Sequence, residues 1–165
     1  MLFRSLMRIA VSGHRGLADD VVSFVEAGIR RELSSYATER DLVGISCLAD
    51  GADQLFATLV LDAGGRLEVV VPAAEYRDRL PDEAKPTYDD LFAKADKIHT
   101  LECVESTSAA HMAASELMVR MADRLFAVWD GQPARAFGGT ADVVAYAQRR
   151  DVPVTVVWPP GAKRR

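Results

Sequence analysis

The sequence predicts an α/β protein: a three-layer Rossmann-like domain with a mostly parallel sheet of about six strands and helices on both faces. Short apolar runs alternate with longer amphipathic stretches along the whole 165-residue chain, as in repeated strand–helix–strand units. The apolar runs are continuous rather than interrupted by polar residues, which is typical of strands buried on both faces. With 49% hydrophobic residues the chain can bury a core, and its length fits a single domain spanning 1–165.

Six apolar runs are expected to form the strands, and most of them end at a glycine, proline or aspartate that favours a turn. They are residues 8–12, 43–48, 67–72, 97–101, 125–129 and 152–158. Four stretches with apolar residues at helical spacing are expected to form helices. They are residues 19–36, 109–122 and 139–150, and a second helix whose apolar stripe is 55–60 and which stops at Gly64 and Gly65. Asp19 and Asp20 in the first turn of one helix, and Arg149 and Arg150 in the last turn of another, suit the helix dipole.

The segment 73–96 departs from this pattern. Pro81 and Pro86 divide it and charged residues are dense, so we expect an irregular helical excursion. Four of its residues are candidates for a lid over a ligand, with a passive, solvated insert as the alternative. They are Tyr76, Arg77, Arg79 and Tyr88. Residues 159–165 are expected to form a flexible tail.

Composition limits the classes of partner. Lys and Arg number 20 against 24 Asp and Glu, a net charge of −4, whereas binding a nucleic-acid backbone requires a concentrated basic face. The basic cluster at 163–165 is interpreted as a solvated end. Cys47 and Cys103 show neither disulfide nor metal-site spacing, which favours the reducing cytoplasm. We expect no membrane span and no signal peptide, because no apolar stretch reaches about 20 residues and Arg8 interrupts the N-terminal one. The sequence does not decide between a monomer and a homo-oligomer.

In a doubly wound sheet the ligand crevice lies beyond the carboxyl ends of the strands, and this rule selects three loops. Residues 12–16, 49–53 and 130–140 each follow a predicted strand, are rich in small residues and lead to a helix. Glycines let a backbone approach a phosphate, and helix N-termini offer unpaired N–H donors. Thr140 adds a hydroxyl at the start of the last helix. The alternative is that the glycines only make tight turns.

His14 and Arg15 are the chemically active residues of the first loop. Arg15 is a candidate for pairing with a phosphate, and the alternative is an ion pair with Asp50 or Asp53. His14 is a candidate for donating to a ligand oxygen or for acid–base work, and the alternative is a bond to a neighbouring backbone group.

Carboxylates follow the same strands. Asp50, Asp53, Asp130 and Asp142 are candidates for holding a ribose diol or a metal, while helix capping and compensation of the helix dipole are the alternatives. The sequence shows no His, Cys and carboxylate set with ligand spacing, so no metal site is predicted, although Mg²⁺ stays open as a cofactor.

Other residues are assigned to packing or left with two interpretations. Trp129 is a candidate for stacking on a base, with core packing as the alternative. Five residues are interpreted as structural: His99, His111, Met112, Met118 and Met121. The chain lacks the dinucleotide pattern GxGxxG, the triphosphate pattern GxxxxGK[ST] and the nucleophile pattern GxSxG. These absences weigh against hydride transfer on a nicotinamide, P-loop hydrolysis and serine-hydrolase chemistry.

With these residues in hand, the sequence resembles the SLOG superfamily of Rossmann-like proteins, which includes the lonely-guy phosphoribohydrolases and the DNA-processing protein A family. The resemblance covers nearly the whole chain. Residues 48–53 look like the S-G-x-A-x-G-x-D element of the DNA-processing branch. Residues 121–131 followed by 138–140 look like the strand and glycine-rich turn by which lonely-guy enzymes hold a nucleotide phosphate. The segment 9–15 carries the rest of the similarity.

The chain departs from the lonely-guy signature PGGxGTxxE. Residues 137–144 read FGGTADVV, so the second glycine spacing and the glutamate are missing. Ala114 falls near the position of that family's helical arginine, with Glu116 and Arg120 nearby. The resemblance therefore implies the phosphate-holding turn but not the catalytic pair. DNA binding, as in the other branch, is not favoured by the acidic charge balance.

We therefore expect binding or sensing of a nucleotide or nucleotide-derived phosphorylated ligand, with Arg15 and the Gly139–Thr140 turn acting on one phosphate. The alternative is a phosphoribohydrolase-like enzyme that cleaves the N-glycosidic bond of a nucleoside monophosphate, with His14, Glu116 and Asp142 as weak catalytic candidates. A protein-interaction module with a vestigial pocket is a third interpretation. The expected ligand-binding residues are Gly13, His14, Arg15, Gly16, Asp50, Gly51, Ala52, Asp53, Asp130, Gly131, Gly138, Gly139 and Thr140.

Overall fold

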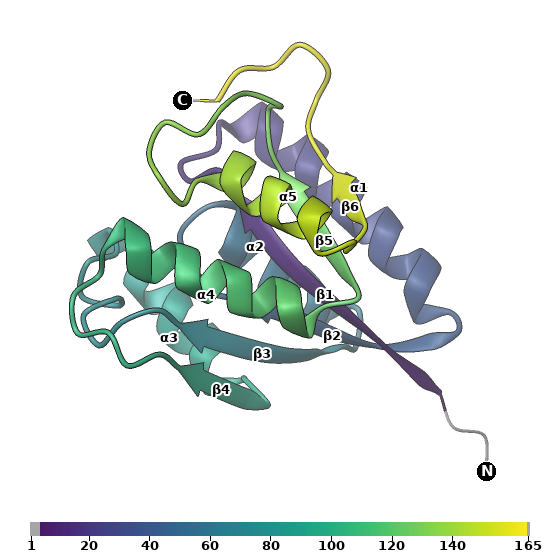
Figure 1. Cartoon of the computed structure of the whole chain (residues 1–165). Helices are drawn as coiled ribbons and strands as arrows, with labels where there is room; N and C mark the ends of the chain where they lie inside the picture. The colour runs from purple at the N-terminus through teal and green to yellow at the C-terminus, as the bar shows by residue number, and fades with distance from the viewer. Residues whose placement is uncertain (1–3, 165) are drawn as a thin grey trace.

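The computed structural model describes residues 4–164 and confirms the predicted α/β fold class (Figure 1). Six strands form one sheet in the order β4-β3-β2-β1-β5-β6, and all five pairings between the described strands are parallel. The strands are β1 (Ser5–Gly13), β2 (Arg40–Ser46), β3 (Arg66–Val71), β4 (Lys97–Thr100), β5 (Arg124–Val128) and β6 (Val154–Val156). Strand β1 begins earlier than expected because residues 5–7 also pair with β2.

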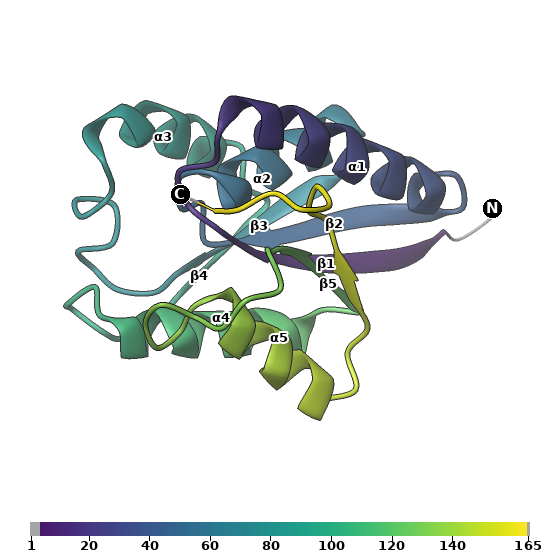
Figure 2. The ribbon, with the colours of Figure 1, turned by 90° about the horizontal axis from the view of Figure 1, so that it is seen from above.

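Helices cover both faces of the sheet, as Figure 2 shows: α1, α2 and α3 lie on one face, and α4 and α5 lie on the other. They are α1 (Asp19–Ala37), α2 (Ala52–Asp62), α3 (Lys85–Ala93), α4 (Ser108–Met121) and α5 (Thr140–Arg149). The apolar stripe of each helix packs on the continuous apolar strands, which gives a hydrophobic core on each face. Among the described residues, no helix is both long and apolar enough to cross a membrane.

The excursion between β3 and β4 is more ordered than the sequence indicates. A 3₁₀ turn, η1 (Asp82–Ala84), leads into α3, which carries Pro86 in its first turn, where proline leaves no helical bond unmade. Tyr76 and Tyr88 are buried in the core, and Arg77 forms two bonds of 2.6 Å with Asp89. Both tyrosines are therefore buried rather than solvated, but only Tyr76 also lines the cavity at the carboxyl edge of the sheet.

A buried ion network ties three strands together on the face covered by α4. Glu68 on β3 is 3% exposed and accepts bonds of 3.0 and 3.1 Å from the two terminal nitrogens of Arg8 on β1. His99 Nε2 on β4 lies 2.8 Å from the same carboxylate. Burial would raise the pKa of Glu68, but these partners hold it below its ordinary value. His99 thus has the structural role expected of it.

The order of the strands fixes where a ligand can enter. The chain builds outward from β1 through β2 and β3 to β4, then crosses back by way of α4 to place β5 on the other side of β1. Gly13 and Val128 are paired at the carboxyl ends of β1 and β5. The connections leave these two strands in opposite directions, which opens a crevice between their ends.

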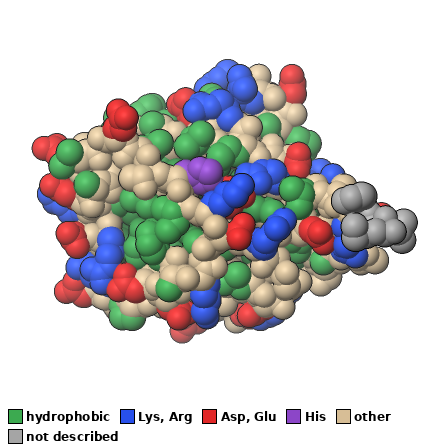
Figure 3. Space-filling view, turned by 90° about the horizontal axis from the view of Figure 1, so that it is seen from below, with side chains coloured by type: hydrophobic (Ala, Val, Ile, Leu, Met, Phe, Trp, Pro, Cys, Tyr) green, Lys and Arg blue, Asp and Glu red, His purple; other side chains and the backbone are tan. Residues whose placement is uncertain are grey.

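Charge is not concentrated on the face of the molecule that Figure 3 presents. Lys and Arg side chains lie among Asp and Glu side chains there, around a patch of hydrophobic ones. This face therefore presents no concentrated basic surface.

Candidate functional site

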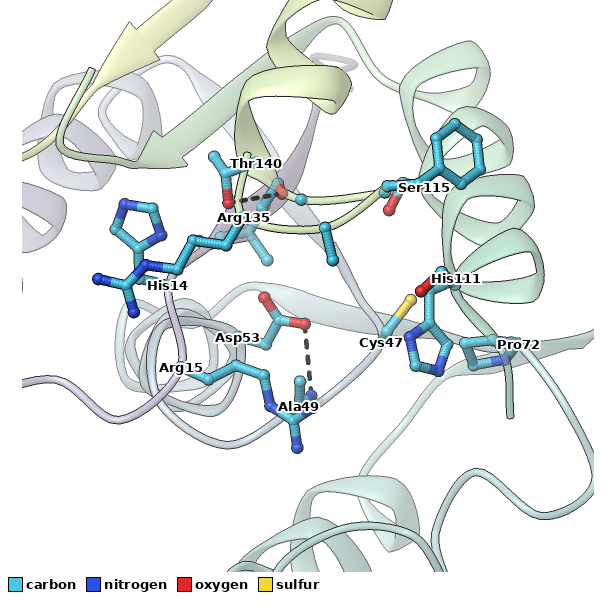
Figure 4. Close-up of a pocket in the computed structure, with 18 of the residues that line it drawn as sticks. His14, Arg15, Cys47, Ala49, Asp53, Pro72, His111, Ser115, Arg135 and Thr140 are labelled. Atoms are coloured by element: carbon cyan, nitrogen blue, oxygen red, sulfur yellow. Dashed lines mark hydrogen bonds between the residues drawn. The ribbon is translucent and has the colours of Figure 1, made fainter. Parts of the chain in front are cut away.

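A cavity of about 390 Å³ lies in this crevice (Figure 4). Its walls are the end of β1, the loop after β2, the segment after β3, one side of α4, the start of α5 with the loop that precedes it, and the C-terminal segment. All three glycine-containing loops selected from the sequence therefore border or brace this edge of the sheet. The volume falls in the range of small-molecule sites, about 300–1,000 Å³.

The turn before α5 forms one wall. Gly138 has φ +87°, and a Cβ there would lie 3.0 Å from the carbonyl oxygen of Ser108, so only glycine fits. Its N–H donates to Asp142 Oδ2 at 2.9 Å, which fixes the turn against the helix. Thr140, the first residue of α5, is buried, and its hydroxyl accepts from Ser12 Oγ at 3.4 Å. The N–H groups at the start of α5 carry its positive dipole end, although the Asp142 N–H already donates to the Gly139 carbonyl at 3.0 Å.

The glycines of the other two loops allow close packing. A Cβ on Gly13 would meet Ala52 Cβ at 2.4 Å, so the end of β1 lies directly against the start of α2. Gly51 has φ +83°, and a Cβ there would lie 2.8 Å from the carbonyl oxygen of His14. Ala52 N–H donates to that same carbonyl at 3.3 Å. By contrast, Gly16 in the first loop and Gly131 at the start of the third have positive φ but open space around them. Among these four, only Gly13 lines the cavity, and Gly16, Gly51 and Gly131 match the tight-turn alternative.

His14 is held inside the fold. Its ring is 7% exposed, and Nε2 accepts from the backbone N–H of Asp130 at 3.1 Å. The rings of His14 and Trp158 pack edge to face, with their centres 5.2 Å apart. Burial lowers the pKa of His14 below its ordinary value, although the Asp130 carboxylate acts in the opposite direction. These contacts match the alternative of a histidine bonded to a neighbouring backbone group.

Arg15 forms the ion pair with Asp50 that was the alternative to phosphate binding. Its Nε donates to Asp50 Oδ1 at 2.7 Å, and the side chain is about half exposed. An ion pair of this exposure is weak, typically about 0–1 kcal/mol, so a phosphate can compete for the guanidinium. The side chain lines the cavity, which keeps that exchange sterically available.

Asp53 is the unusual group of the site. Its side chain, in the first turn of α2, is 8% exposed and points into the cavity, where Oδ2 accepts from the Ala49 N–H at 3.3 Å (Figure 4). Burial raises the pKa of Asp53 to about 7, outweighing the Ala49 bond and the charge of Arg15. Near neutral pH this carboxyl group is therefore present in both protonation states.

The remaining carboxylates support the loops. Asp130 Oδ1 accepts from the Gln132 N–H at 3.0 Å. Burial would raise the pKa of Asp130, but that bond, His14 and Arg164 together hold it below its ordinary value. Asp142 braces the Gly138 turn, and Glu116 lies 4.0 Å from Arg120 one turn along α4. Neither Asp142 nor Glu116 lines the cavity, so the weak catalytic set of His14, Glu116 and Asp142 is not brought together.

Two arginines that the sequence analysis did not select line the cavity, Arg135 and Arg164. Arg164 is not a solvated end: its side chain is 15% exposed, donates to the Pro133 carbonyl at 3.0 Å and lies 3.6 Å from Asp130 Oδ2. The signal for this arrangement is the turn sequence at 159–161, whose glycine has φ +75° and directs the tail back over the sheet edge.

His111 was interpreted as structural, and the structure gives it a place in the cavity as well. It lies in the first turns of α4, with Nε2 2.7 Å from Ser106 Oγ and its ring edge-on to Tyr76. Burial lowers the pKa of His111, and the charge of Arg15 adds to this effect. Among residues 4–164, no group of three or more His, Cys, Asp and Glu is arranged to hold a metal ion.

No protein-family model and no curated protein sequence matches the chain. Several solved structures, however, match the chain in fold. DNA processing protein A from Streptococcus pneumoniae matches with a TM-score of 0.65 and 18% identity, over 92% of this chain and 50% of that one. The Helicobacter pylori protein, described with single-stranded DNA binding, matches with a TM-score of 0.70 and 15% identity, over 96% of this chain and 68% of that one. This chain shares the fold of DNA processing protein A.

A second group of structures shares that fold. The molybdenum cofactor binding protein from Rippkaea orientalis matches with a TM-score of 0.58 and 14% identity, over 94% of this chain and 77% of that one. The chain spans half the length of the pneumococcal DNA processing protein A. These likenesses confirm the predicted Rossmann-like fold, and at such identities they concern the fold alone.

Proposed function

We propose that the protein binds a nucleotide or a nucleotide-derived phosphorylated ligand at the carboxyl edge of its sheet, with the phosphate at the start of α5. The observation that carries the proposal is a cavity at the strand-order switch that is bounded by the N-terminus of α5 and by two arginines, Arg135 and Arg164. An anion there meets oriented N–H groups and positive charge together.

Each part of such a ligand has complementary groups. The Thr140 and Ser12 hydroxyls and the small Gly139 border the phosphate position. Farther in, Asp53 and His111 supply polar atoms for a sugar or a base. The similar proteins that bind single-stranded DNA or the molybdenum cofactor support a ligand role for this fold. The net charge of −4 favours a small ligand over a nucleic acid.

Binding is favoured over hydrolysis. Cleavage of an N-glycosidic bond requires an acid or base that reaches the leaving base and a group that stabilises the developing cation. Of the catalytic candidates, Glu116 and Asp142 lie outside the cavity, and the Nε2 of His14 is engaged by the backbone.

The test compares a nucleoside with its 5′-monophosphate by calorimetry. Arg135→Gln and Arg15→Ala remove one cavity arginine each, and Arg30→Gln, on the exposed face of α1, is the matched control. We expect Arg135→Gln to weaken the monophosphate by about 10–150-fold, corresponding to about 1.5–3 kcal/mol for a hydrogen bond to a charged group, and to leave the nucleoside nearly unchanged. Arg15→Ala reports whether Arg15 leaves Asp50 for the phosphate.

Three results distinguish the outcomes. A loss confined to the monophosphate supports the phosphate position. An equal loss for nucleoside and monophosphate places the arginine away from the phosphate. If AMP, GMP, CMP, UMP, ADP-ribose and diadenosine diphosphate all fail to bind the unmodified protein at millimolar concentration, the proposed function is wrong.

A further inference from the structure

A second, larger cavity adjoins the first. Its volume is about 870 Å³, and it lies between the ends of β5 and β6 and the C-terminal segment that turns back over them. Arg135 and Arg164 line both cavities. The proposed phosphate position therefore has a compartment on each side, and these two arginines lie between the compartments.

Two tryptophans border the second cavity, one after each strand. Trp129 Nε1 donates to the Gln132 carbonyl at 2.8 Å, and Trp158 Nε1 donates to the Ala162 carbonyl at 2.9 Å. Both indole N–H groups are thus satisfied within the chain, and both rings are held in place before any ligand arrives. Both side chains are only partly buried, so apolar ring surface remains available for stacking.

The charges around this cavity favour an anionic ligand. Arg135, Lys163 and Arg164 line it, against a single carboxylate, Asp130, which accepts from the Gln132 N–H and lies beside Arg164. Aromatic surface next to basic side chains is the combination that binds a base together with its phosphate.

We propose that the second cavity receives a second base, so that the ligand is a soluble dinucleotide whose two bases are joined through phosphate. The phosphates lie along Arg135 and Arg164, one nucleoside occupies the first cavity, and the second base stacks on Trp129 or Trp158. This inference rests on the proposed function and names the class of ligand that the same site takes.

The sequence provides a direct reporter. The chain contains two tryptophans, and both line the second cavity, so intrinsic tryptophan fluorescence monitors this compartment specifically. Three probes form a series: AMP, ADP-ribose and diadenosine diphosphate. ADP-ribose carries the pyrophosphate and second ribose of the dinucleotide but lacks its second base. Affinity is measured by calorimetry and occupancy of the second cavity by fluorescence quenching.

We expect diadenosine diphosphate to bind about 5–150-fold more tightly than ADP-ribose, the factor that corresponds to about 1–3 kcal/mol of base–aromatic stacking. Quenching should accompany diadenosine diphosphate and be small for AMP. Trp129→Leu should remove most of that advantage and leave ADP-ribose binding within about twofold, because Trp129 lies away from the first cavity. Trp158→Phe leaves Trp129 as the single fluorophore and shows whether it is the quenched ring.

The outcomes separate this inference from the proposed function. If AMP binds while ADP-ribose and diadenosine diphosphate bind equally and without quenching, the second-base inference is wrong and the proposed function stands. If no nucleotide binds, both are wrong. If a single-stranded oligodeoxyadenylate binds more tightly than diadenosine diphosphate, the second cavity serves a nucleic acid and the dinucleotide proposal is overturned. If Trp129→Leu fails to fold, the comparison of the two unmodified-protein affinities still decides the question.

Discussion

Replacing Asp53 with Asn tests the most unusual electrostatic feature of the site. The carboxyl pKa rises from 3.8 to about 7 on folding because the group is buried in the cavity wall. Between these two values the folded protein keeps a proton that the unfolded chain has released, so the stability of the unmodified protein falls as the pH rises from 4 to 7. The shift corresponds to a loss of about 4 kcal/mol, since each pKa unit is worth about 1.4 kcal/mol. Asn has the shape of the protonated acid and never ionises.

We therefore expect Asp53→Asn to match the unmodified protein near pH 4 and to exceed it by about 4 kcal/mol at pH 8. The assay is urea unfolding at a series of pH values, with the difference between the two proteins plotted against pH so that other ionisable groups cancel. Asp20→Asn, at an exposed position in the first turn of α1, controls for the change in net charge. A difference that does not depend on pH would refute the raised pKa and, with it, the description of Asp53 as a group that changes charge near neutrality.

Two further substitutions test the packing that supports the site. Gly13→Ala should lower the free energy of unfolding, measured in urea, by about 1–3 kcal/mol, because the new Cβ would lie 2.4 Å from the Cβ of Ala52. The double variant Gly13→Ala/Ala52→Gly should recover part of this loss. If it recovers none, the strain lies elsewhere. Arg8→Met should cost about 3 kcal/mol above pH 4.5, because it leaves the Glu68 carboxylate buried without its main partner. That cost should shrink as the pH falls and Glu68 takes up a proton, and a cost that stayed constant would contradict the buried ion network.

The strands and most helices could be predicted because the sequence patterns that indicate them involve residues close together in the chain. Continuous apolar runs and helical spacing are properties of neighbouring residues, and they identified all six strands. The boundaries that were missed involve residues whose burial depends on distant contacts. Helix α2 begins at Ala52, inside the predicted loop 49–53, and its first turn buries Asp53 and Gln54 although they are polar. Gln54 is stabilised there by donating to the carbonyl oxygens of Leu48 and Ala84, which no sequence period reveals.

The site could be predicted only in part for the same reason. The loops follow from topology, so the Gly138–Thr140 turn was located in advance at the cavity wall. Arg164 was missed because its position depends on a tail that turns back from Pro159 to reach Asp130. For His14 and Arg15 the sequence left two interpretations open, and the decision depended on whether Asp130 and Asp50 came within bonding distance.

The turn before α5 also explains why the arginines belong to the proposed site. The Gly138 N–H is already bound by Asp142, so this donor is not available to a ligand, and the carboxylate places a negative charge within the first turn of the helix. An incoming phosphate therefore meets the remaining helix N–H groups together with a repulsive charge behind them. Arg135 and Arg164 supply positive charge on the cavity side of the turn and offset that repulsion. A glycine turn of this sequence is thus insufficient by itself to define an anion site, and the proposed binding depends on side chains that the fold brings from the loop before α5 and from the C-terminal segment.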